Sequence, residues 1–179
     1  MKAPLFSLDC NKFTEGLARV RVKDKTRFMD KKGNLVINFN DVLFFDFPFS
    51  EGLTLARDKE HNFGYIDKKG VLVIPCVWHL AHQFSESLAA VKNENGWHFI
   101  NKYGNIVLKS QWNIKWGFVG NFAIVEKEEK YGFIDKTGKL LGEIEWDETR
   151  SFSEGLAMVR KGEKIGYINK SGKIKFWIK

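Results

Sequence analysis

The chain has 179 residues, of which 44% are hydrophobic and 15% aromatic, a composition that excludes a disordered segment. Its formal charge of +7, from 29 Lys and Arg against 22 Asp and Glu, favours weak attraction to polyanions but does not indicate a fold. No apolar stretch approaches the ~18 residues of a membrane-spanning helix, and the first residues lack the apolar segment of a secretory signal. The sequence therefore predicts a cytoplasmic protein.

A pattern of about 34 residues recurs five times along the chain. The copies open on Phe13, Phe49, Phe84, Phe118 and Phe152, which lie 36, 35, 34 and 34 residues apart. An Asp or Asn followed by Lys, a variable residue and Gly recurs later in each copy, at 30–33, 67–70, 101–104, 135–138 and 169–172. Tandem copies at a fixed period predict a single repeat domain over residues 1–179, with repeats of approximately 1–38, 39–74, 75–108, 109–142 and 143–179.

Three short strands are expected in each repeat, always in the same order. The first follows the Phe-x-Glu-Gly opening, at 17–22, 53–56, 88–91, 122–125 and 156–159. The second is rich in aromatic residues, at 63–67, 97–101, 131–135 and 165–169, and the glycine inside three of these strands indicates close approach of a neighbouring group. The Asp/Asn-Lys-x-Gly motif predicts a tight hairpin turn with a bulge. The third strand follows it, at 35–37, 72–74, 106–108, 140–141 and 174–176.

Helical periodicity is absent, so the predicted fold class is all-β. Each repeat is expected to be a short antiparallel three-stranded meander that buries its apolar face only by stacking on its neighbours. We expect the five repeats to form an open twisted solenoid, because ~34 residues are few for the four-stranded blades of a propeller. The alternative is a closed five-bladed propeller-like ring.

Side chains that recur at the repeat period are expected to serve the structure. The phenylalanines that open each repeat, and a tryptophan in the linkers (Trp78, Trp112 and Trp146), are typical of core between repeats rather than of a stacking platform for a ligand. The glutamates after the phenylalanines (Glu15, Glu51, Glu86 and Glu154) suit a hydrogen bond repeated in every copy. An acid–base pair would instead need two carboxyl groups in different environments.

Catalytic and metal-binding motifs are not found in the sequence. His79, His82 and His98 lack the number and type of companion ligands that zinc sites use. Cys10 and Cys76 occupy non-equivalent positions in their repeats, which predicts free thiols rather than a disulfide. No nucleophile elbow, phosphate-binding loop or dinucleotide fingerprint is present. We therefore expect no enzyme activity, no catalytic residues, no metal and no cofactor.

Basic residues form the candidate binding surface. Arg21, Arg57, Lys92 and Arg160 follow the first strand of their repeats, and Glu126 breaks the row in the fourth copy. Such a row could contact an acidic protein face or follow a phosphate backbone. The simpler interpretation is that these charges, like the turn lysines Lys31, Lys68, Lys102, Lys136 and Lys170, are solvated and keep strand edges from pairing.

The residues that recur at the same place in each repeat resemble the pattern of the WG repeat family, also called KWG repeats, found mostly in bacterial proteins. Its pattern is roughly Phe-x-Glu-Gly-Leu-Ala-x-Val, then Trp-Gly-aromatic-Ile-Asp/Asn-x-x-Gly, then an apolar strand. The resemblance covers nearly the whole chain, but the Trp-Gly position itself reads Phe63-Gly64, Trp97-His98, Tyr131-Gly132 and Ile165-Gly166 here. It implies a binding or scaffolding surface without agreed catalytic residues.

The expected function is therefore a non-catalytic protein-binding or scaffolding repeat module, whose partner is another protein. The alternative is an electrostatic binder of a polyanion, nucleic acid or acidic glycan, through Arg21, Arg57, Lys92 and Arg160. No membrane and no small-molecule substrate are expected.

Overall fold

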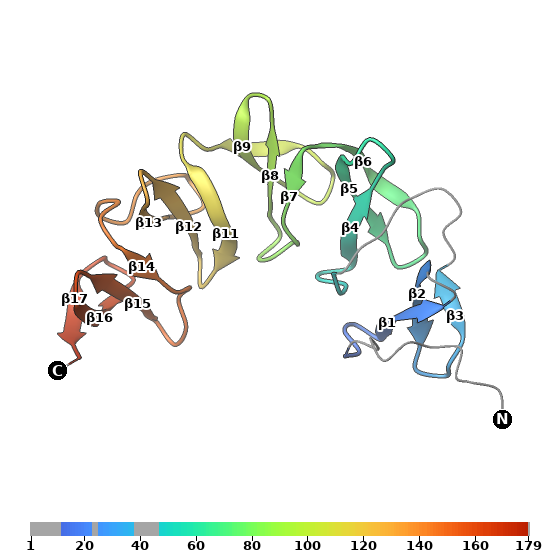
Figure 1. Ribbon diagram of the computed structural model, residues 1–179, viewed down its shortest axis with the longest axis horizontal. Coiled ribbons are helices and arrows are strands. Elements are labelled where there is room, and N and C mark those ends of the chain that lie inside the picture. Colours follow the sequence, from blue (N-terminus) through green and yellow to red (C-terminus); the bar gives the residue numbers. More distant parts are fainter. Residues whose placement is uncertain (1–11, 23–24, 38–46, 179) are drawn as a thin grey trace. The chain divides into compact units, whose positions relative to one another are not determined.

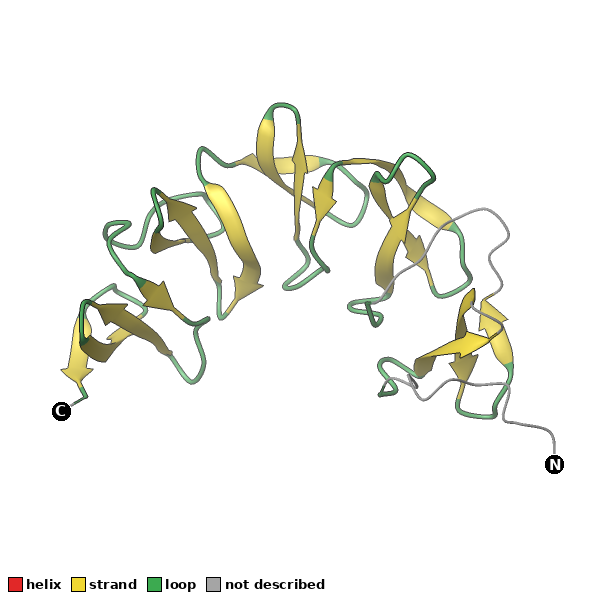
Figure 2. Ribbon diagram, in the orientation of Figure 1, coloured by secondary structure: helices red, strands yellow, loops and turns green. Residues whose placement is uncertain are grey.

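The computed structural model describes residues 12–22, 25–37 and 47–178. All of the secondary-structure elements within these ranges are β-strands (Figures 1 and 2). The chain divides into two compact units, Met1–Phe84 and Ser85–Lys179. The single domain over residues 1–179 stays a prediction. Among the described residues, no helix has the length and apolar character needed to traverse a lipid bilayer.

The first unit contains two three-stranded antiparallel sheets, one from each of the first two repeats. In each sheet the strands pair in chain order, so both are simple meanders as predicted. Its strands are β1 (Leu17–Val22), β2 (Lys25–Asp30), β3 (Leu35–Ile37), β4 (Leu53–Arg57), β5 (Phe63–Asp67), β6 (Leu72–Trp78) and the short β7 (Leu80–Ala81).

The second unit contains the sheets of repeats 3, 4 and 5. All its strand pairs are antiparallel, and the strands are β8 (Ala89–Asn93), β9 (Gly96–Ile100), β10 (Ile106–Lys109), β11 (Asn113–Val119), β12 (Phe122–Lys127), β13 (Lys130–Ile134), β14 (Glu148–Thr149), β15 (Leu156–Lys161), β16 (Lys164–Asn169) and β17 (Ile174–Trp177). The all-β class and the antiparallel meanders are thus confirmed.

The linkers and the fourth repeat depart from the prediction. β11 and β14 arise from residues expected to be linkers, and they pair with the first strands of repeats 4 and 5. The prediction of a third strand at 140–141 is wrong, since Leu140 forms only an isolated bridge with Ile134. The physical reason is Gly142, whose φ of +79° turns the chain, after which Trp146 pairs with Tyr131 along that edge.

The Asp/Asn-Lys-x-Gly turns have the predicted geometry. In the first of them, Asp30 Oδ1 accepts hydrogen bonds from the backbone N–H groups of Lys32 at 2.8 Å and Asn34 at 2.9 Å, and Gly33 has a φ of +87°. The same pair of side-chain hydrogen bonds recurs in the other four repeats, at Asp67, Asn101, Asp135 and Asn169. The motif therefore fixes the turn that follows the second strand in every repeat.

The Phe-x-Glu-Gly opening is a second tight turn. In repeat 1 the backbone N–H and C=O groups of Thr14 and Leu17 exchange two hydrogen bonds, and both central residues, Glu15 and Gly16, have positive φ values of 51° and 89°. Positive φ at both positions is the type I′ geometry that joins twisted strands. Glutamate rarely adopts it, so its presence there points to a use for its side chain.

Aromatic pairs connect each repeat to the next. The phenylalanine that opens a repeat packs on the aromatic residue in the second strand of the preceding repeat, with ring centroids 4.6 to 5.1 Å apart, in the pairs Phe28–Phe49, Tyr65–Phe84, Phe99–Phe118 and Phe133–Phe152. The core clusters accordingly combine side chains of adjacent repeats. This confirms the predicted core for four of the five opening phenylalanines. Phe13 is the exception, with 41% of its surface exposed.

Glutamates of the opening turn connect neighbouring repeats a second time. Glu15 Oε2 accepts from the Gly52 N–H at 2.9 Å and pairs with Lys68 Nζ at 2.9 Å, both in repeat 2. Glu86 repeats the arrangement between repeats 3 and 4, with Asn121 N–H at 3.0 Å and Lys136 Nζ at 3.0 Å. The predicted structural hydrogen bond is thus confirmed for Glu15 and Glu86, and the turn lysines Lys68 and Lys136 are partners in it.

Replacing Phe118 with alanine tests the packing between repeats. Phe118 is fully buried between repeats 3 and 4. The Phe118→Ala variant should lower the free energy of unfolding by about 3–5 kcal/mol because it leaves a cavity in a close-packed core. Denaturant titration followed by tryptophan fluorescence measures the change. Tyr103→Ala, which removes a side chain that is 86% exposed, is the control and should stay within about 0.5 kcal/mol of wild type.

The glutamate contacts also predict a pH dependence of stability. Burial alone would raise the pKa of Glu86, but the hydrogen bonds from Asn121 and Lys136 outweigh it, and the pKa is lowered from the ordinary value of 4.5. A carboxyl whose folded-state pKa is depressed contributes stability that is complete above about 4.5 and is lost as the pH falls through the folded-state value. The unfolding midpoint should therefore fall below this pH, and less steeply in Glu86→Gln. An equally steep fall in Glu86→Gln and in the exposed control Glu163→Gln would contradict the assignment.

Candidate functional site

The predicted basic residues of the first unit lie at the hairpin between the first two strands of their repeats. Arg21 is exposed near the end of β1. Arg57 ends β4, where its guanidinium lies 5.2 Å from the centre of the Phe63 ring and its Nε donates to the His61 carbonyl at 3.1 Å. The Arg57 side chain is thus held against its own hairpin.

The predicted basic residues of the second unit occupy the same hairpin position. Lys92 faces Trp97 across β8 and β9, with its ammonium 6.0 Å from the ring centre, and Arg160 faces Ile165 across β15 and β16. Glu126 takes the equivalent position opposite Tyr131 in repeat 4. The sign of the charge therefore alternates from repeat 3 to repeat 5, and no uniformly basic row follows these three hairpins.

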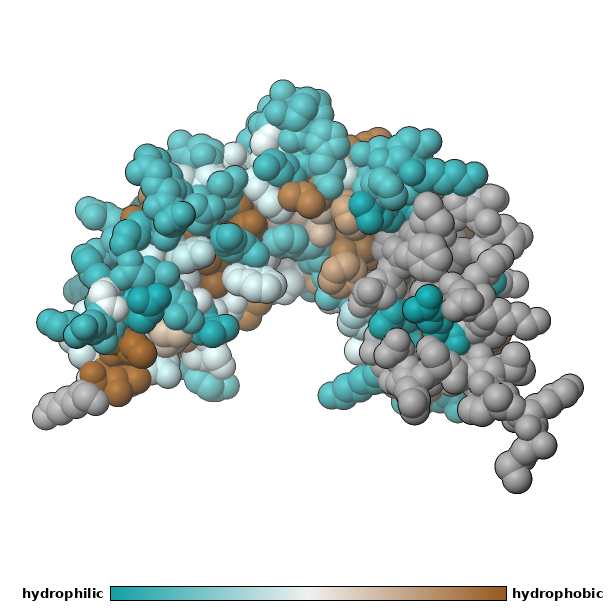
Figure 3. All heavy atoms as spheres, viewed as in Figure 1, coloured by the Kyte–Doolittle hydropathy of each residue, from teal (hydrophilic) through white to brown (hydrophobic). Residues whose placement is uncertain are grey.

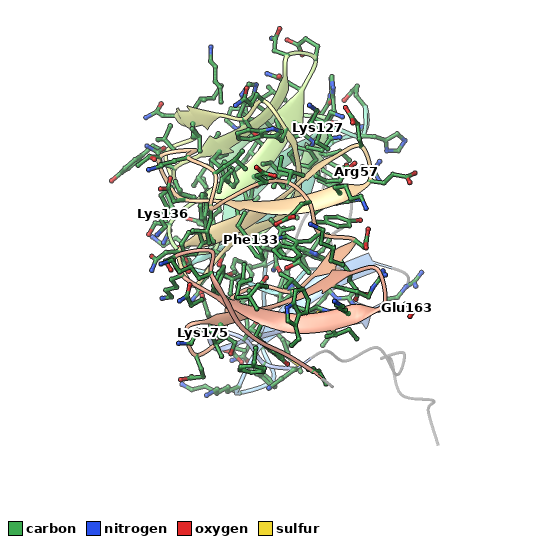
Figure 4. The ribbon with its side chains drawn as sticks, turned by 90° about the vertical axis from the view of Figure 1, so that its left-hand side faces the viewer. Arg57, Lys127, Phe133, Lys136, Glu163 and Lys175 are labelled. Atoms are coloured by element: carbon green, nitrogen blue, oxygen red, sulfur yellow. The ribbon has the colours of Figure 1, made fainter. Side chains whose placement is uncertain are left out.

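The two ends of the repeats differ in what their charges do. Figure 4 shows Lys127 and Glu163 on the hairpin side of the second unit and Lys136 on the opposite side, with Phe133 between them. Lys136 is a partner of Glu86 in the contact between repeats. The hairpin side carries the hollows of the surface, so it is the candidate binding side of this unit.

A groove of about 400 Å³, called the Trp116 groove below, opens on this side. Trp116 of β11 has 63% of its surface exposed, and Lys115 holds its ammonium 5.9 Å from the centre of the neighbouring Tyr131 ring. The rest of the lining comes from the β14 segment and β15, and includes Asp147, Glu148, Arg150 and Arg160. Regular alternation would place Trp116 on the same face as the buried Ile114 and Phe118, two residues to either side in β11. The pairing of β11 with β12 shifts register on both sides of Trp116, and these irregularities accompany its exposure.

Ion pairs fix the charged wall of the Trp116 groove. Glu148 binds two arginines, with Arg150 Nη2 at 3.2 Å from Oε1 and Arg160 Nε at 3.4 Å from Oε2. Asp147 pairs with Lys130 and accepts the Gly162 N–H at 2.6 Å, and these interactions lower the pKa of the Asp147 carboxyl. The groove thus presents three basic side chains, Lys115, Arg150 and Arg160, and the carboxyl groups of Asp147 and Glu148 beside an exposed indole.

A second groove, of about 620 Å³, lies one repeat earlier, between the hairpins of repeats 3 and 4. Trp97 and Trp112 take the places of Tyr131 and Trp146 in the repeat pattern, and Lys92 and Glu126 lie at the rim. Its charges balance, with Lys92 and Lys127 against Glu126 and Glu128. A groove at this place therefore recurs in two neighbouring repeats, but of the two only the Trp116 groove contains a strongly exposed aromatic side chain, Trp116.

The histidines and Cys76 stand apart from both grooves. His98 is buried in β9, and its Nε2 lies 3.0 Å from Asn93 Oδ1. Burial lowers the pKa of His98 and of His82, and it raises the pKa of the half-buried, free Cys76 thiol. Within the described ranges no three metal-ligating side chains gather, and Cys10 lies outside them. The arrangement around the grooves is suited to recognition by stacking and ion pairing.

Sequence reasoning missed Trp116, Lys115 and Arg150. Trp116 lies two residues before an opening phenylalanine, where no other repeat carries tryptophan. An aromatic residue outside the recurrent columns was the signal that could have identified it. Of the predicted residues, Lys92 and Arg160 line the two grooves, whereas Arg21 and Arg57 belong to the first unit.

Solved structures resemble the chain in fold at low sequence identity. The computationally designed Ika8 protein is 14% identical with a TM-score of 0.53, a eukaryotic initiation factor 9% with 0.57, and Hsv2 of Kluyveromyces lactis 8% with 0.53. The matches cover 91%, 93% and 92% of this chain, which spans only 58%, 52% and 61% of those chains. No curated protein gives a significant match.

The family model described as "WG containing repeat" matches three consecutive segments, residues 63–97, 99–131 and 131–164. Together they cover more than half of the chain. The second and third segments open close to the aromatic second strands β9 and β13, and the first opens on β5, so the match follows the period of the sheets. The chain therefore belongs to the family of proteins built from WG containing repeats.

Proposed function

We propose that this chain is a non-catalytic protein-binding module that scaffolds another protein or a larger assembly, and that the Trp116 groove is its principal contact. The observation that carries the proposal is an indole with 63% of its surface in solvent, on a strand in which Ile114 and Phe118, two residues to either side, are buried. Tryptophan and arginine are the side chains most enriched at the energetic centres of protein interfaces. The repeat architecture holds Trp116 on a β-strand, so little conformational entropy is lost when it binds.

The charges of the grooves favour a protein partner over a polyanion. Three cations and two anions line the Trp116 groove, and two of each line its neighbour. A phosphate backbone or an acidic glycan would meet a carboxylate at every step along such a surface, while counterion release requires a run of unopposed cations. A protein surface with both signs of charge can complement this pattern and gain specificity from it.

The absence of catalysis is proposed from the state of the carboxylates. A general acid or base works best with a pKa near the working pH, usually raised by burial. The pKa of Asp147 is shifted the other way, since the Lys130 ammonium and the Gly162 N–H stabilise its charged form. Glu148 is bound between two arginines. Both carboxylates therefore serve to position the cationic side chains of the groove.

An open array is the arrangement we propose for the five repeats. Propeller blades that close a ring have four strands each. Among the described residues three of the sheets have three strands, and in the other two the fourth strands, β7 and β14, contain two residues each. The stacking of an open array leaves the outer faces of repeats 1 and 5 accessible, which a closed ring would not.

The test is capture of a partner by the immobilised chain from an extract of its source organism. A partner bound by wild type and by Tyr103→Ala, but about 30-fold more weakly by Trp116→Ala, is expected, since loss of a central interface tryptophan costs about 2 kcal/mol or more. Tyr103 is a matched control because it is also an exposed aromatic residue, in the turn at 101–104. Unfolding midpoints should be unchanged in both variants.

Three results would contradict the proposal. Equal binding of the partner by wild type and Trp116→Ala would remove the groove from the interface. Binding that disappears with nuclease, falls steeply with salt and survives Trp116→Ala would instead support a polyanion ligand. Turnover by the isolated chain would remove the non-catalytic assignment.

A further inference from the structure

The contacts between repeats follow a rule with three parts. The hydroxyl group after the opening phenylalanine donates to the carbonyl oxygen of the next opening phenylalanine, as from Ser50 to Phe84 at 2.7 Å and from Ser85 to Phe118 at 2.6 Å. The opening glutamate binds a backbone N–H and the turn lysine of the next repeat. The second-strand aromatic residue packs on the next opening phenylalanine.

Repeat 5 presents all three groups on its outer face. Ser153 and Glu154 are exposed, and Glu154 has a φ of +50°, within a few degrees of Glu15 and Glu86. Tyr167 takes the place of Phe28, Tyr65 and Phe99 in the second strand. No interaction of Ser153 or Glu154 side chains with another repeat is present within the described part of the chain. Repeat 5 thus carries the hydroxyl group and the carboxylate that make the polar contacts between other repeats, but within the described residues neither contacts another repeat.

The third strand of repeat 5 shows the same incompleteness in its apolar side chains. Ile37 and Ile74 lie across the sheet from Phe28 and Tyr65, and each is 1% exposed. Ile37 shares a core cluster with Phe49, which opens the next repeat. Phe176 lies at the equivalent place across from Tyr167 and is 50% exposed. Figure 3 shows hydrophobic atoms gathered beside β17, where Trp177 and Ile178 are also partly exposed.

Repeat 1 presents the complementary groups. Phe13 is 41% exposed, whereas the four later opening phenylalanines are buried. Lys31 is exposed at the turn position of Lys68 and Lys136, and the Gly16 N–H is at the position of the Gly52 N–H that binds Glu15. A glutamate from a preceding repeat would therefore find both of its usual partners on repeat 1.

We propose that the outer face of repeat 5 binds repeat 1 of a second copy of this chain, head to tail. Glu154 then accepts from the Gly16 N–H and pairs with Lys31 of the second copy. Ser153 donates to the Phe13 carbonyl oxygen, and the Phe13 ring packs on Tyr167 and covers Phe176. The internal contacts between repeats 1 and 2 and between repeats 3 and 4 are the template for each of these interactions.

The complementarity specifies both the partner and its orientation. Two copies joined through repeat 5 alone would place Glu154 against Glu154, and two joined through repeat 1 would place Lys31 against Lys31, so like charges disfavour both symmetric pairings. A head-to-tail interface is heterologous, and each added copy presents the same free faces again. The product is a chain of copies whose length grows with concentration. The inference uses the proposed open array, in which these two faces are free, and is independent of the Trp116 groove.

Charge reversal and mixing test the proposal by sedimentation velocity over a concentration series. Wild type should associate as concentration rises, and Glu154→Lys and Lys31→Glu should each weaken association about tenfold or more, because attraction becomes repulsion. Glu163→Lys, which changes net charge as Glu154→Lys does, should associate like wild type. An equimolar mixture of Glu154→Lys and Lys31→Glu should associate again, since each outer face then meets its opposite charge on the other variant.

Three outcomes would overturn the proposal. One is a wild type that stays monomeric at every concentration while neither reversal alters its unfolding midpoint. Another is a monomeric wild type whose midpoint falls with each single reversal and recovers in the double variant, which would mean that repeat 5 binds repeat 1 of its own chain. The last is association that survives both reversals. Changes in partner capture by Trp116→Ala would not affect any of these readouts.

Discussion

The structure depends on one constraint: a three-stranded repeat of this size cannot cover its own apolar face. The aromatic side chain in the second strand reaches beyond its sheet, and the next opening phenylalanine completes the contact, as Phe118 does on Phe99. Both rings are fully buried although each belongs to a different sheet. Contacts between adjacent repeats therefore contribute much of the buried apolar surface. The spacing of 34 to 36 residues is the consequence, because every copy must present the same face at the same place.

Periodic residues made most of the fold predictable. Each hairpin turn with Asp or Asn at its first position formed as expected, because the hydrogen bonds of Asp30 and its equivalents are local to four or five residues. The interpretation of the opening glutamates as structural is confirmed for Glu15 and Glu86, because each carboxylate meets the same groups of the next repeat. The linkers were not predicted, since β11 is defined by pairing with β12 and its residues follow no period shared with the other repeats. The missing third strand of repeat 4 depended on Gly142, a residue outside the recurrent columns.

The candidate site was less predictable for the same reason. A binding surface distinguishes one repeat from another, so its residues lie outside the pattern that identifies the fold. Lys92 and Arg160 were found because they recur, and they do line the grooves, but Trp116 and Arg150 occur once. Sequence spacing also could not show that Glu148 would bind both Arg150 and Arg160, since the short strand β14 brings that segment beside β15. A recurring basic residue in the sequence thus does not predict the charge of the surface, because that charge also depends on which carboxylates lie beside it in the structure.

The contact between repeats 4 and 5 links the fold to this site. Repeat 4 has Val119 and Gly120 where other repeats carry a hydroxyl group and glutamate, and a side chain at Gly120 would meet the Phe152 Cβ at 2.7 Å. The polar connection is made instead on the hairpin side, where Lys130 of repeat 4 pairs with Asp147. Within repeat 5, Lys161 pairs with Glu145, so the segment that leads to Glu148 and Arg150 is held from both sides. Two departures from the repeat pattern, Val119 and Gly120, therefore accompany a new polar contact on the opposite side, and that contact forms the wall of the Trp116 groove. A repeat array can in this way gain a distinct binding surface at one position while every other repeat keeps the geometry that stacking requires.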